Sequence, residues 1–586
     1  MIGPENAFSQ ELHATKYRDE GETFDDYCVR YARTTADDEK HFRGMLDALR
    51  HQRLLPAGRQ QLAVGRPYEI TAVNCFVGST IDDSIDGIFA EVRRAAMTLR
   101  TGGGCGWDFS SLRPKGDPVR GLGVKAYSTG PVSFMGVWNA TCDTIMSAGH
   151  RRGAMMAVLR VDHPDIMTFI SAKQDQSTLK NFNISVAVTD EFMEALENDA
   201  LYELKFGGRT YDKVRALDVW ARIMERNWDW AEPGVLFIDR INQLNPLGYC
   251  ETIAATNPCG EQPLPTNGAC LLGSLNVAKY LTPTMRPRNG NVLERTYEID
   301  MSRFEEDIVH AVRAFDNVID RTNYPLEEQR LEQKHKRRMG LGVTGLANAL
   351  EVCGYPYASE GYIEQQERIL RRLRDVAYLT SVEIGKKKGV FPFFSAEGWL
   401  GSGFAQSLPE DIRGQIAKHG LRNGLLLSIA PTGTISMCAD NVSSGIEPAF
   451  ALVQERRVHM PQGETTVEFK DYAYEKYGIR GRTVNDVTAQ EHVSVLCSAQ
   501  KFIDSAVSKT CNVYGRVSGK GKGISFEEFK QLYMQAWHGG AKGCTTFNVN
   551  GKRFGILKSV EQDTETETDG AACAIDPKTG VRTCDG

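Results

Sequence analysis

The sequence predicts an α/β protein. Between about residue 155 and residue 450, short apolar runs alternate with stretches of helical periodicity. Runs such as 185–188 and 425–429 have the length of buried strands, whereas 302–321 has the spacing of a helix. Alternating strands and helices are typical of α/β folds. The length of 586 residues is compatible with about four domains, or with one large catalytic core carrying appendages.

The first part of the chain is expected to be helical. Charged and apolar residues mix at helical spacing through 1–70, for example in 37–50. A short β-rich stretch follows at 71–78, and 83–100 has the pattern of an amphipathic helix that ends at three consecutive glycines. A loop rich in Gly and Pro then leads to a second expected helix at 131–148.

Composition excludes several classes of function. The hydrophobic fraction of 41% is enough for a large core, and the net charge of −6 gives no sign of a nucleic-acid-binding surface. Two basic runs, 334–338 and 386–388, are flanked by opposite charges, so we expect both to be solvated helix faces. No apolar run approaches the roughly 18 residues of a membrane span, and 1–22 lacks a signal-peptide core.

We therefore expect a cytoplasmic protein whose 14 cysteines are mostly reduced. The chain has no Cys-x-x-Cys and no Cys/His set with zinc-finger spacing, so we predict no metal site. Most of the cysteines are expected to be ordinary core or surface thiols, and examples are Cys28, Cys142, Cys353, Cys497 and Cys511.

The stretch Asn257-Pro258-Cys259-Gly260-Glu261 carries the most chemistry. It places an amide, a thiol and a carboxylate at alternate positions, and a thiol beside a carboxylate can combine radical or nucleophilic chemistry with proton transfer. Pro258 and Gly260 predict a tight loop that brings the three groups together. Taken alone, the stretch fits a surface turn with a buried cysteine about equally well.

Two Gly-containing stretches resemble phosphate-binding loops. Met339–Gly345 matches Gly-x-Gly-x-x-Gly, but the residues before it do not resemble a buried strand, so we favour close backbone packing in a turn. The second stretch follows the apolar run 425–429 and combines Gly with three hydroxyl side chains whose donors could converge on an anion. It comprises Pro431, Thr432, Gly433, Thr434, Ile435 and Ser436. A simple strand-to-helix turn is the alternative.

Four further cysteines divide into two kinds. Cys75 and Cys270 lie in short apolar segments and, by themselves, resemble core thiols. Cys573 and Cys584 lie beyond the acidic stretch 560–570, which has no hydrophobic period and is expected to be a disordered linker. A cysteine pair on a flexible tail indicates dithiol–disulfide exchange. The linker would reach about 23 Å on average and roughly 60 Å at most, so the tail could visit a distant site.

Taken together, these pieces resemble the catalytic chain of ribonucleotide reductase, from about residue 54 to the C-terminus. The similar stretches occur in the family's order, and they are Asn257–Glu261, Cys270–Asn276, Arg338–Ala347, Pro431–Ser436 and Ser443–Pro448. The resemblance implies a ten-stranded α/β barrel made of two five-stranded parallel halves that run antiparallel to each other. It implies a barrel over 71–555, a helical region over 1–70 and a flexible redox tail over 556–586.

The resemblance also implies a role for each candidate residue. Cys259 would become a thiyl radical and abstract the ribose 3′ hydrogen, Glu261 would take the 3′-hydroxyl proton, and Asn257 would hydrogen-bond the sugar hydroxyls. Cys75 and Cys270 would supply two electrons and form a disulfide. The remaining assignments are Asn74 for substrate binding, Pro431–Ser436 for the substrate phosphates, and Cys573 and Cys584 for re-reduction by thioredoxin or a similar donor.

The source of the radical is expected to be adenosylcobalamin. The segment Gly540–Arg553 has no tandem tyrosines of the kind that relay a radical from a separate metal subunit, and the glycyl-radical motif is absent. It resembles instead the Lys-Gly-x-Thr-x-Tyr-Arg pattern of the cobalamin-dependent class, although Phe547 and Asn548 replace Tyr-Arg. Two alternatives are a large chain that needs a metal subunit and an inactive nucleotide-binding paralogue.

Regulation is implied as well. Asp82, Arg100 and Arg113 match positions that bind a deoxynucleotide triphosphate effector, and the loop 173–181 resembles the one that transmits its identity to the substrate site. This effector and dimer region spans about 80–180, where 130–154 resembles dimeric members, so we expect a homodimer. The 55 or so residues before the match leave no room for an ATP cone, and we expect no shut-off by dATP. The dimeric resemblance favours ribonucleoside diphosphates over triphosphates as substrates.

Overall fold

Five parallel strands form the first half of a central sheet in this computed structural model. They are β2 (Cys75–Val77), β3 (Gly104–Asp108), β4 (Met155–Arg160), β5 (Phe182–Val188) and β8 (Gly234–Phe237). Each pairs in parallel with the next.

The structure describes residues 2–119, 125–145, 153–174, 177–288, 292–460, 463–515, 523–552 and 558–559.

The second half of the sheet runs in the opposite direction. Its strands are β11 (Ala269–Asn276), β14 (Met339–Thr344), β17 (Thr510–Val513) and β18 (Gly543–Asn548). The extended segment 425–429 fills the gap between β14 and β17, because Leu341 bridges Leu427 and Ile429 bridges Val507 in parallel. Antiparallel pairing joins β11 to β2 and β18 to β8.

The hydrogen-bonded ladder therefore returns to its starting strand after ten members. This closed arrangement of two antiparallel five-stranded halves confirms the fold that the family resemblance implied. The short strand β1 (Leu54–Pro56) adds to it by pairing antiparallel with β11.

Side chains alternate between the two faces of this barrel, as the two-residue period of strands requires. Cys75, Val77 and Met156 belong to one buried cluster with Cys270 and Leu272. Their immediate neighbours in the chain, including Phe76, Ala157 and Leu271, belong to a separate and larger cluster. The smaller cluster fills the barrel interior and contains the thiols of β2 and β11. The larger one joins the barrel wall to the surrounding helices.

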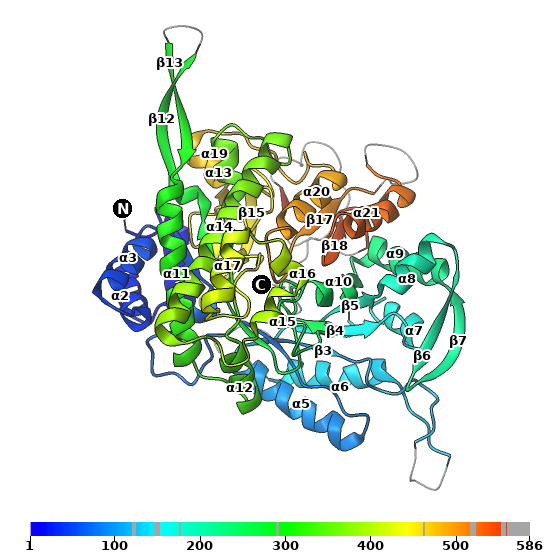
Figure 1. Cartoon of the computed structure of the whole chain (residues 1–586). Coiled ribbons are helices and arrows are strands. Elements are labelled where there is room, and N and C mark those ends of the chain that lie inside the picture. Colours follow the sequence, from blue (N-terminus) through cyan, green and yellow to red (C-terminus); the bar gives the residue numbers. More distant parts are fainter. Residues whose placement is uncertain are drawn as a thin grey trace.

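The helices enclose the barrel, as Figure 1 shows. Those after the first two strands are α5 (Ile85–Arg100), α6 (Pro131–Thr144), α7 (Ile166–Ile170), α8 (Asp190–Glu197), α9 (Ala216–Trp230) and α10 (Ile238–Gln243). The middle of the chain adds α11 (Met301–Arg321), α12 (Glu327–Lys336), α13 (Leu346–Val352), α14 (Glu360–Lys388), α15 (Ala396–Leu400), α16 (Gly403–Gln406) and α17 (Glu410–His419). The last are α18 (Gly433–Met437), α19 (Tyr472–Tyr477), α20 (Ala489–Gln500) and α21 (Phe526–His538).

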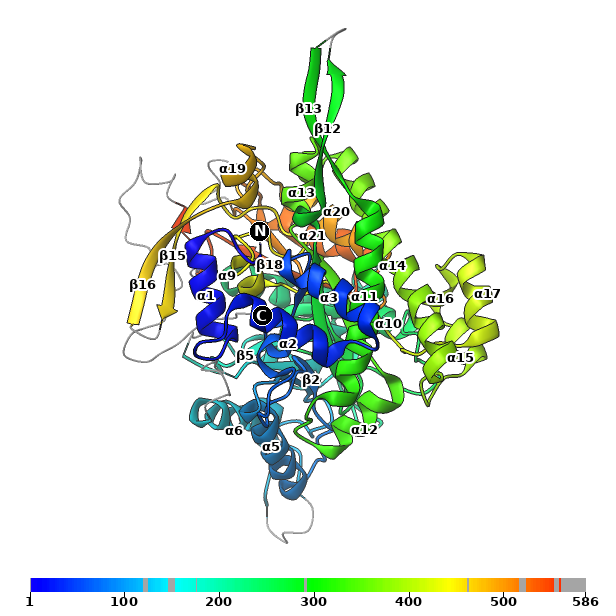
Figure 2. The same ribbon diagram turned by 90° about the vertical axis from the view of Figure 1, so that its left-hand side faces the viewer.

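The predicted helical region at the start of the chain is confirmed. It consists of α1 (Ala7–Tyr17), α2 (Phe24–Thr35), α3 (Glu39–Arg50) and α4 (Gly58–Ala63). A capping box at Thr23 and Asp26 starts α2, and the Asp38 carboxylate caps α3. In Figures 1 and 2 these helices form a layer beside α11, and α2 and α3 both pack against it.

Antiparallel hairpins extend the body of the molecule at several points (Figures 1 and 2). They are β6 (Leu201–Phe206) with β7 (Arg209–Arg215), β12 (Leu281–Arg288) with β13 (Val292–Ile299), and β15 (Val453–Met460) with β16 (Gly463–Lys470). The strand β19 (Lys558–Ser559) adds to β15. A short 3₁₀ helix, Val277–Tyr280, connects β11 to β12.

The interpretation of Met339–Gly345 as a turn was wrong. The stretch is no turn, because six of its residues form the buried strand β14. The glycines are needed because neighbouring chain comes very close: a Cβ at Gly342 would lie 2.2 Å from the Ser428 carbonyl oxygen. Gly345 then has φ +67° and begins α13. Close backbone packing was correctly expected, but it occurs within a strand.

The basic run 334–338 is also not the solvated face that was expected. Lys336, Arg337 and Arg338 are all buried, since the chain turns inward at Arg337 (φ +51°) to enter β14. Arg337 pairs with Asp316 at 2.8 Å, and Lys336 pairs with Glu251 at 2.9 Å. The other basic run, 386–388, does lie exposed at the end of α14, as predicted.

Some of the remaining expectations can be compared with the structure, and others concern residues that it does not describe. Helices were correctly placed at 83–100, where Ser84 caps α5, and at 131–148, where α6 ends at Thr144. In the described part of the chain, no helix is both long enough and apolar enough to cross a bilayer. The predicted tail 556–586 lies almost wholly outside the described residues, and so do His150, Arg151 and Arg152 of the predicted dimer region.

Candidate active site

The loop Asn257–Glu261 lies at the tip of a short hairpin. Its strands are β9 (Ala255–Thr256) and β10 (Pro263–Leu264), which pair antiparallel. The Gly260 N–H donates to the Asn257 carbonyl at 3.1 Å, which closes the turn. Gly260 has φ +81°, a left-handed conformation that favours glycine. The tight loop predicted from Pro258 and Gly260 is confirmed.

Glycines in the barrel wall let this hairpin lie against the strand β3. A Cβ at Gly106 would sit 1.9 Å from the Thr256 carbonyl oxygen, and one at Gly104 would sit 3.2 Å from Cγ of Pro258. On the strand β5, the Asn183 side chain donates to the Pro258 carbonyl at 2.8 Å. These contacts fix the loop against the wall of the barrel.

Asn257 and Glu261 both reach the thiol of Cys75. The Asn257 amide donates to Cys75 Sγ at 3.1 Å, and the Cys75 thiol donates to Glu261 Oε1 at 3.6 Å. The Asn257 Oδ1 accepts the Gln262 N–H at 2.9 Å, which orients the amide nitrogen toward the sulfur. The structure thus gathers three of the predicted residues around one sulfur atom.

Cys270 completes this group. It lies directly opposite Cys75 in the antiparallel pairing of β11 with β2. Cys75 is 4% exposed and Cys270 is fully buried, whereas Cys259 is half-buried. Burial raises the pKa of both Cys75 and Cys270 well above the ordinary value, and the Glu261 carboxylate raises that of Cys75 further. Both sulfurs are therefore held as protonated thiols, able to give up hydrogen.

A second set of residues holds the main chain of Glu261. The Ser428 hydroxyl and the Ala506 N–H both donate to the Glu261 carbonyl at 3.0 Å. The buried ammonium of Lys542 in turn donates to the carbonyls of Asp504 and Ser505 at 2.5 and 2.7 Å. Sequence reasoning missed these supports. The run 425–429 that contains Ser428 was recognised, but its contact with Glu261 depends on barrel closure.

The stretch Pro431–Ser436 leaves the end of segment 425–429 and turns into α18. Thr432 has φ +55°, and its hydroxyl bonds that of Thr344 at 2.9 Å and accepts the Gly445 N–H at 2.8 Å. Ser436 contacts Ser444 through their hydroxyls at 3.0 Å. No atom of the described residues lies within 4 Å of the point where a Cβ of Gly433 would project. Hydroxyl side chains and an open position therefore occur along the same short stretch.

The other predicted binding residues are more dispersed. Asn74 precedes Cys75, and its Oδ1 has no hydrogen-bond partner among the described residues. Asp82 and Arg100 lie at opposite ends of α5, which is about 24 Å long. Arg113 lies at the Asp82 end and pairs with Asp83 at 2.6 Å. The single chain does not bring all three effector candidates together. Cys573 and Cys584 lie outside the described residues.

Comparison with known proteins now identifies the family. Residues 73–547 match the family described as ribonucleotide reductase, barrel domain. The chain belongs to the ribonucleotide reductase family. The match covers most of the chain, including every barrel strand and the Asn257–Glu261 hairpin, and it leaves the N-terminal helical layer outside.

Several curated members of the ribonucleotide reductase family are similar over most of this chain. A protein of Thermoplasma acidophilum named vitamin B12-dependent ribonucleoside-diphosphate reductase is 34% identical over 524 residues, which cover 84% of this chain and 63% of that protein. A protein of Mycobacterium tuberculosis with the same name is 34% identical over 541 residues, covering 87% and 72% respectively. The chain thus spans less than two thirds of the Thermoplasma relative.

A ribonucleotide reductase subunit with a different name is more distant. The ribonucleoside-diphosphate reductase subunit alpha of Helicobacter pylori is 25% identical over 571 residues, which cover 82% of this chain and 71% of that protein.

In the described part of the chain, no group of three or more His, Cys, Asp or Glu side chains is arranged to hold a metal ion.

Proposed function

We propose that this protein reduces ribonucleoside diphosphates to 2′-deoxyribonucleoside diphosphates with adenosylcobalamin as its radical source. The observation that carries the proposal is the grouping of Asn257, Glu261 and Cys270 around Cys75 beside the half-buried Cys259. The names of the Thermoplasma and Mycobacterium relatives support both the cofactor and the diphosphate substrate.

The residues divide the reaction among them. The Cys259 thiol would lose its hydrogen atom to the radical that adenosylcobalamin supplies when it is bound. The Cys259 thiyl radical then takes the 3′ hydrogen of the ribose, while Glu261 accepts the 3′-hydroxyl proton and Asn257 orients the sugar. The partial exposure of Cys259 fits an oxidant that approaches from outside the protein, and the absence of a side chain at Gly260 leaves room beside it.

Cys75 and Cys270 complete the chemistry. The 2′ oxygen leaves as water, and the two thiols give two electrons and two hydrogens as their sulfurs join in a disulfide. The Cys259 thiol then returns the hydrogen atom to the 3′ carbon, which completes the product and leaves the radical on the Cys259 sulfur again. The balanced sum is ribonucleotide plus dithiol to deoxyribonucleotide, disulfide and water. The tail thiols Cys573 and Cys584 reduce the disulfide for the next turnover and exchange with thioredoxin or a similar dithiol protein.

The substrate phosphates are assigned to Pro431–Ser436 and the sugar to the neighbourhood of Asn74. Gly433 offers open space to the described residues around it, and the next residue, Thr434, is half-buried. The unpartnered Asn74 Oδ1 lies one residue from the reactive Cys75 and is available to accept a sugar hydroxyl.

A homodimer with a deoxynucleotide effector is also part of the proposal. Ile85, Phe89 and Met97 leave 42–62% of their surfaces exposed along one side of α5, which supports pairing with another copy. In an antiparallel pair of α5 helices, the Asp82 and Arg113 end of one protomer meets the Arg100 end of its partner. That pairing would assemble the effector residues which one protomer keeps apart.

One assay tests the activity. Purified protein is incubated with a dithiol reductant, adenosylcobalamin and either ribonucleoside diphosphates or triphosphates, without any partner protein. We expect deoxyribonucleoside diphosphates to form. Product that appears only when a metal-containing subunit replaces the cobalamin would identify the alternative large-chain function instead. Binding of nucleotides without turnover under either condition would favour an inactive paralogue.

A further inference from the structure

The N-terminal helical layer contacts the segment that carries the proposed phosphate site. This layer precedes residue 73, where the match to the family begins. Its contacts reach the C-terminal end of α18, whereas Pro431 and Thr432 precede the N-terminal end of this helix. The contacts come from α1, from the residues that precede it, and from the turn after α3.

Two buried side chains hold the last carbonyls of α18. The Ser9 hydroxyl donates to the Met437 carbonyl at 2.6 Å, and the Gln52 amide donates to the Cys438 carbonyl at 2.9 Å. Carbonyls at the end of a helix have no partner within the helix, and these two donors supply a hydrogen bond to each. Ser9 is fully buried and Gln52 is 2% exposed, so water does not compete for these bonds.

A third contact anchors the chain just beyond α18. The Asp440 Oδ1 accepts the N–H groups of Glu5 and Asn6 at 2.7 and 2.9 Å. The other oxygen of the same carboxylate accepts Lys279 Nζ at 2.7 Å. Asp440 has φ +61°, so the chain reverses here while its side chain is held from two directions.

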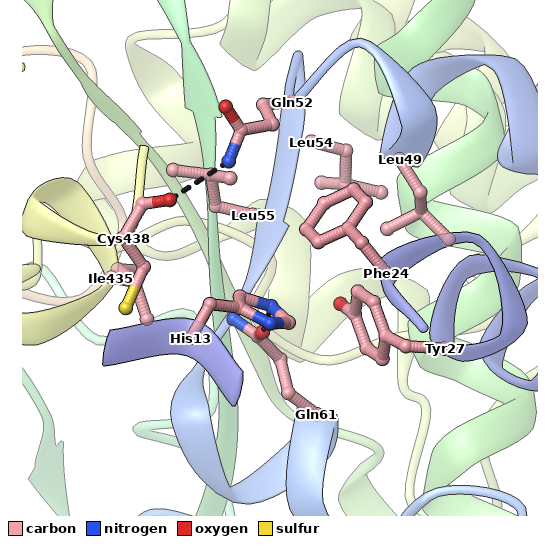
Figure 3. A pocket seen from close by; sticks show the side chains of 10 residues that line it. All are labelled: His13, Phe24, Tyr27, Leu49, Gln52, Leu54, Leu55, Gln61, Ile435 and Cys438. Atoms are coloured by element: carbon pink, nitrogen blue, oxygen red, sulfur yellow. Dashed lines mark hydrogen bonds between the residues drawn. The ribbon is translucent and has the colours of Figure 1, made fainter. Parts of the chain in front are cut away.

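Apolar packing between the two parts is incomplete. Figure 3 shows Ile435 and Cys438 of this segment facing the N-terminal layer across a small cavity. The cavity measures about 10 Å³, which is room for one water molecule, and His13 and Gln61 also line it. Ile435, Met437 and Cys438 are nonetheless buried in the core, and the bonds from Ser9 and Gln52 add directional contacts at this end of α18.

We propose that the N-terminal helical layer positions the phosphate-binding segment, with Ser9 and Gln52 as its positioning residues. The inference rests on the assignment of Pro431–Ser436 to the substrate phosphates. Loss of either bond lets α18 shift toward the cavity and moves Thr434 and Ser436 away from the phosphate position. Nucleotide binding weakens, whereas the Cys259 hairpin lies elsewhere in the barrel and keeps its geometry.

The test compares Ser9→Ala and Gln52→Leu with the matched control Thr35→Val. Thr35 is likewise a fully buried N-terminal residue whose hydroxyl donates to a main-chain carbonyl, that of Tyr31 at 2.9 Å, but it does not touch α18. For each protein, the Kd of a ribonucleoside diphosphate, the Kd of inorganic pyrophosphate, kcat, KM and the melting temperature are measured.

We expect Ser9→Ala and Gln52→Leu to raise Kd and KM roughly three- to ten-fold for the diphosphate, with a similar rise for pyrophosphate and little change in kcat. Thr35→Val should lower the melting temperature comparably and leave both Kd values unchanged. Equal Kd values in all three variants overturn the positioning role. Absence of turnover in the unmodified protein counts against the proposed reaction alone, because the Kd comparison does not depend on turnover.

Discussion

Cys75 and Cys270 face each other across the antiparallel pair of β2 with β11. Residues directly opposite in such a pair have Cα atoms about 4.5–5.5 Å apart, within the span of about 4.4–6.8 Å that a disulfide bridges. The two sulfurs can therefore join without movement of the strands that carry them. The barrel wall itself sets the geometry of the proposed reductant.

This relationship predicts the yield of a single turnover. In a Cys573→Ser/Cys584→Ser variant without external reductant, we expect about one deoxynucleotide per chain and a Cys75–Cys270 disulfide in the peptide mass spectrum. The unmodified protein, which has the tail pair as well, should give up to two. A disulfide that joins Cys259 to either partner would contradict the assignment. A Cys250→Ser variant is the control for the loss of a cysteine, because it removes an exposed thiol that has no assigned role in the reaction.

Replacement of Cys259 by serine should abolish turnover, because a hydroxyl group does not yield its hydrogen atom to form the required radical. The loop should persist, since Gly260 and Asn257 make its closing bond through the main chain. Nucleotide affinity, measured by equilibrium dialysis, should stay within about two-fold of the unmodified protein. Residual deoxynucleotide formation above background would remove Cys259 from the proposed role.

The open space at Gly433 gives a test of the phosphate site. Gly433→Ala places a methyl group where none of the described atoms lies within 4 Å, so the folded state should tolerate it. Gly414 in α17 has the same open surroundings and provides the control. Both changes should alter stability by less than about 1 kcal/mol. Only Gly433→Ala should raise KM for the diphosphate, by several-fold, and an unchanged KM would place the phosphates elsewhere.

Local sequence signals predicted the parts of the site that lie close together in the chain. Pro258 and Gly260 predicted the loop because their backbone preferences act locally, and the apolar run 425–429 was recognised for the same reason. The meeting of Asn257 with Cys75 spans 182 residues and follows from barrel closure. The family resemblance implied that both residues act on one ribose, but their direct contact was not predicted.

The errors have an equally physical origin. Charge patterning at 334–338 predicted a solvated face, because Lys and Arg are rarely buried. The partners that make burial tolerable, Asp316 and Glu251, lie about 20 and 85 residues away and cannot be paired from the sequence alone. The strand β14 was missed because its glycines look like turn residues until the neighbouring Ser428 main chain is in place.

The burial of Arg337 predicts a large effect on stability. Its guanidinium contacts Asp316, which is fully buried, and Arg337→Leu leaves that carboxylate with fewer partners, chiefly Arg422 and Asn423. We expect a loss of about 3 kcal/mol in urea unfolding. Lys387→Ala in the exposed basic run should change stability by no more than about 0.5 kcal/mol. Equal effects of the two substitutions would contradict the buried ion pair.

The buried Lys542 predicts a pH dependence of stability. Burial lowers the pKa of its ammonium to about 8, although the Asp504 carboxylate opposes the shift. Between about pH 8 and the ordinary value of 10.5, the unfolded chain therefore binds more protons at this residue than the folded chain does. Stability contributed by this group must rise with pH across that window and stay constant below it.

Comparison with Lys542→Met isolates this effect. The free energy of unfolding of the unmodified protein, relative to that variant, should increase by about 3 kcal/mol between pH 7 and pH 11. Lys501→Met, which removes an exposed lysine, is the control. Since Lys542 holds the carbonyls of Asp504 and Ser505, beside the Ala506 N–H that binds Glu261, Lys542→Met should also lower kcat. Parallel stability curves for Lys542→Met would show that the amine is charged in the folded protein throughout this range.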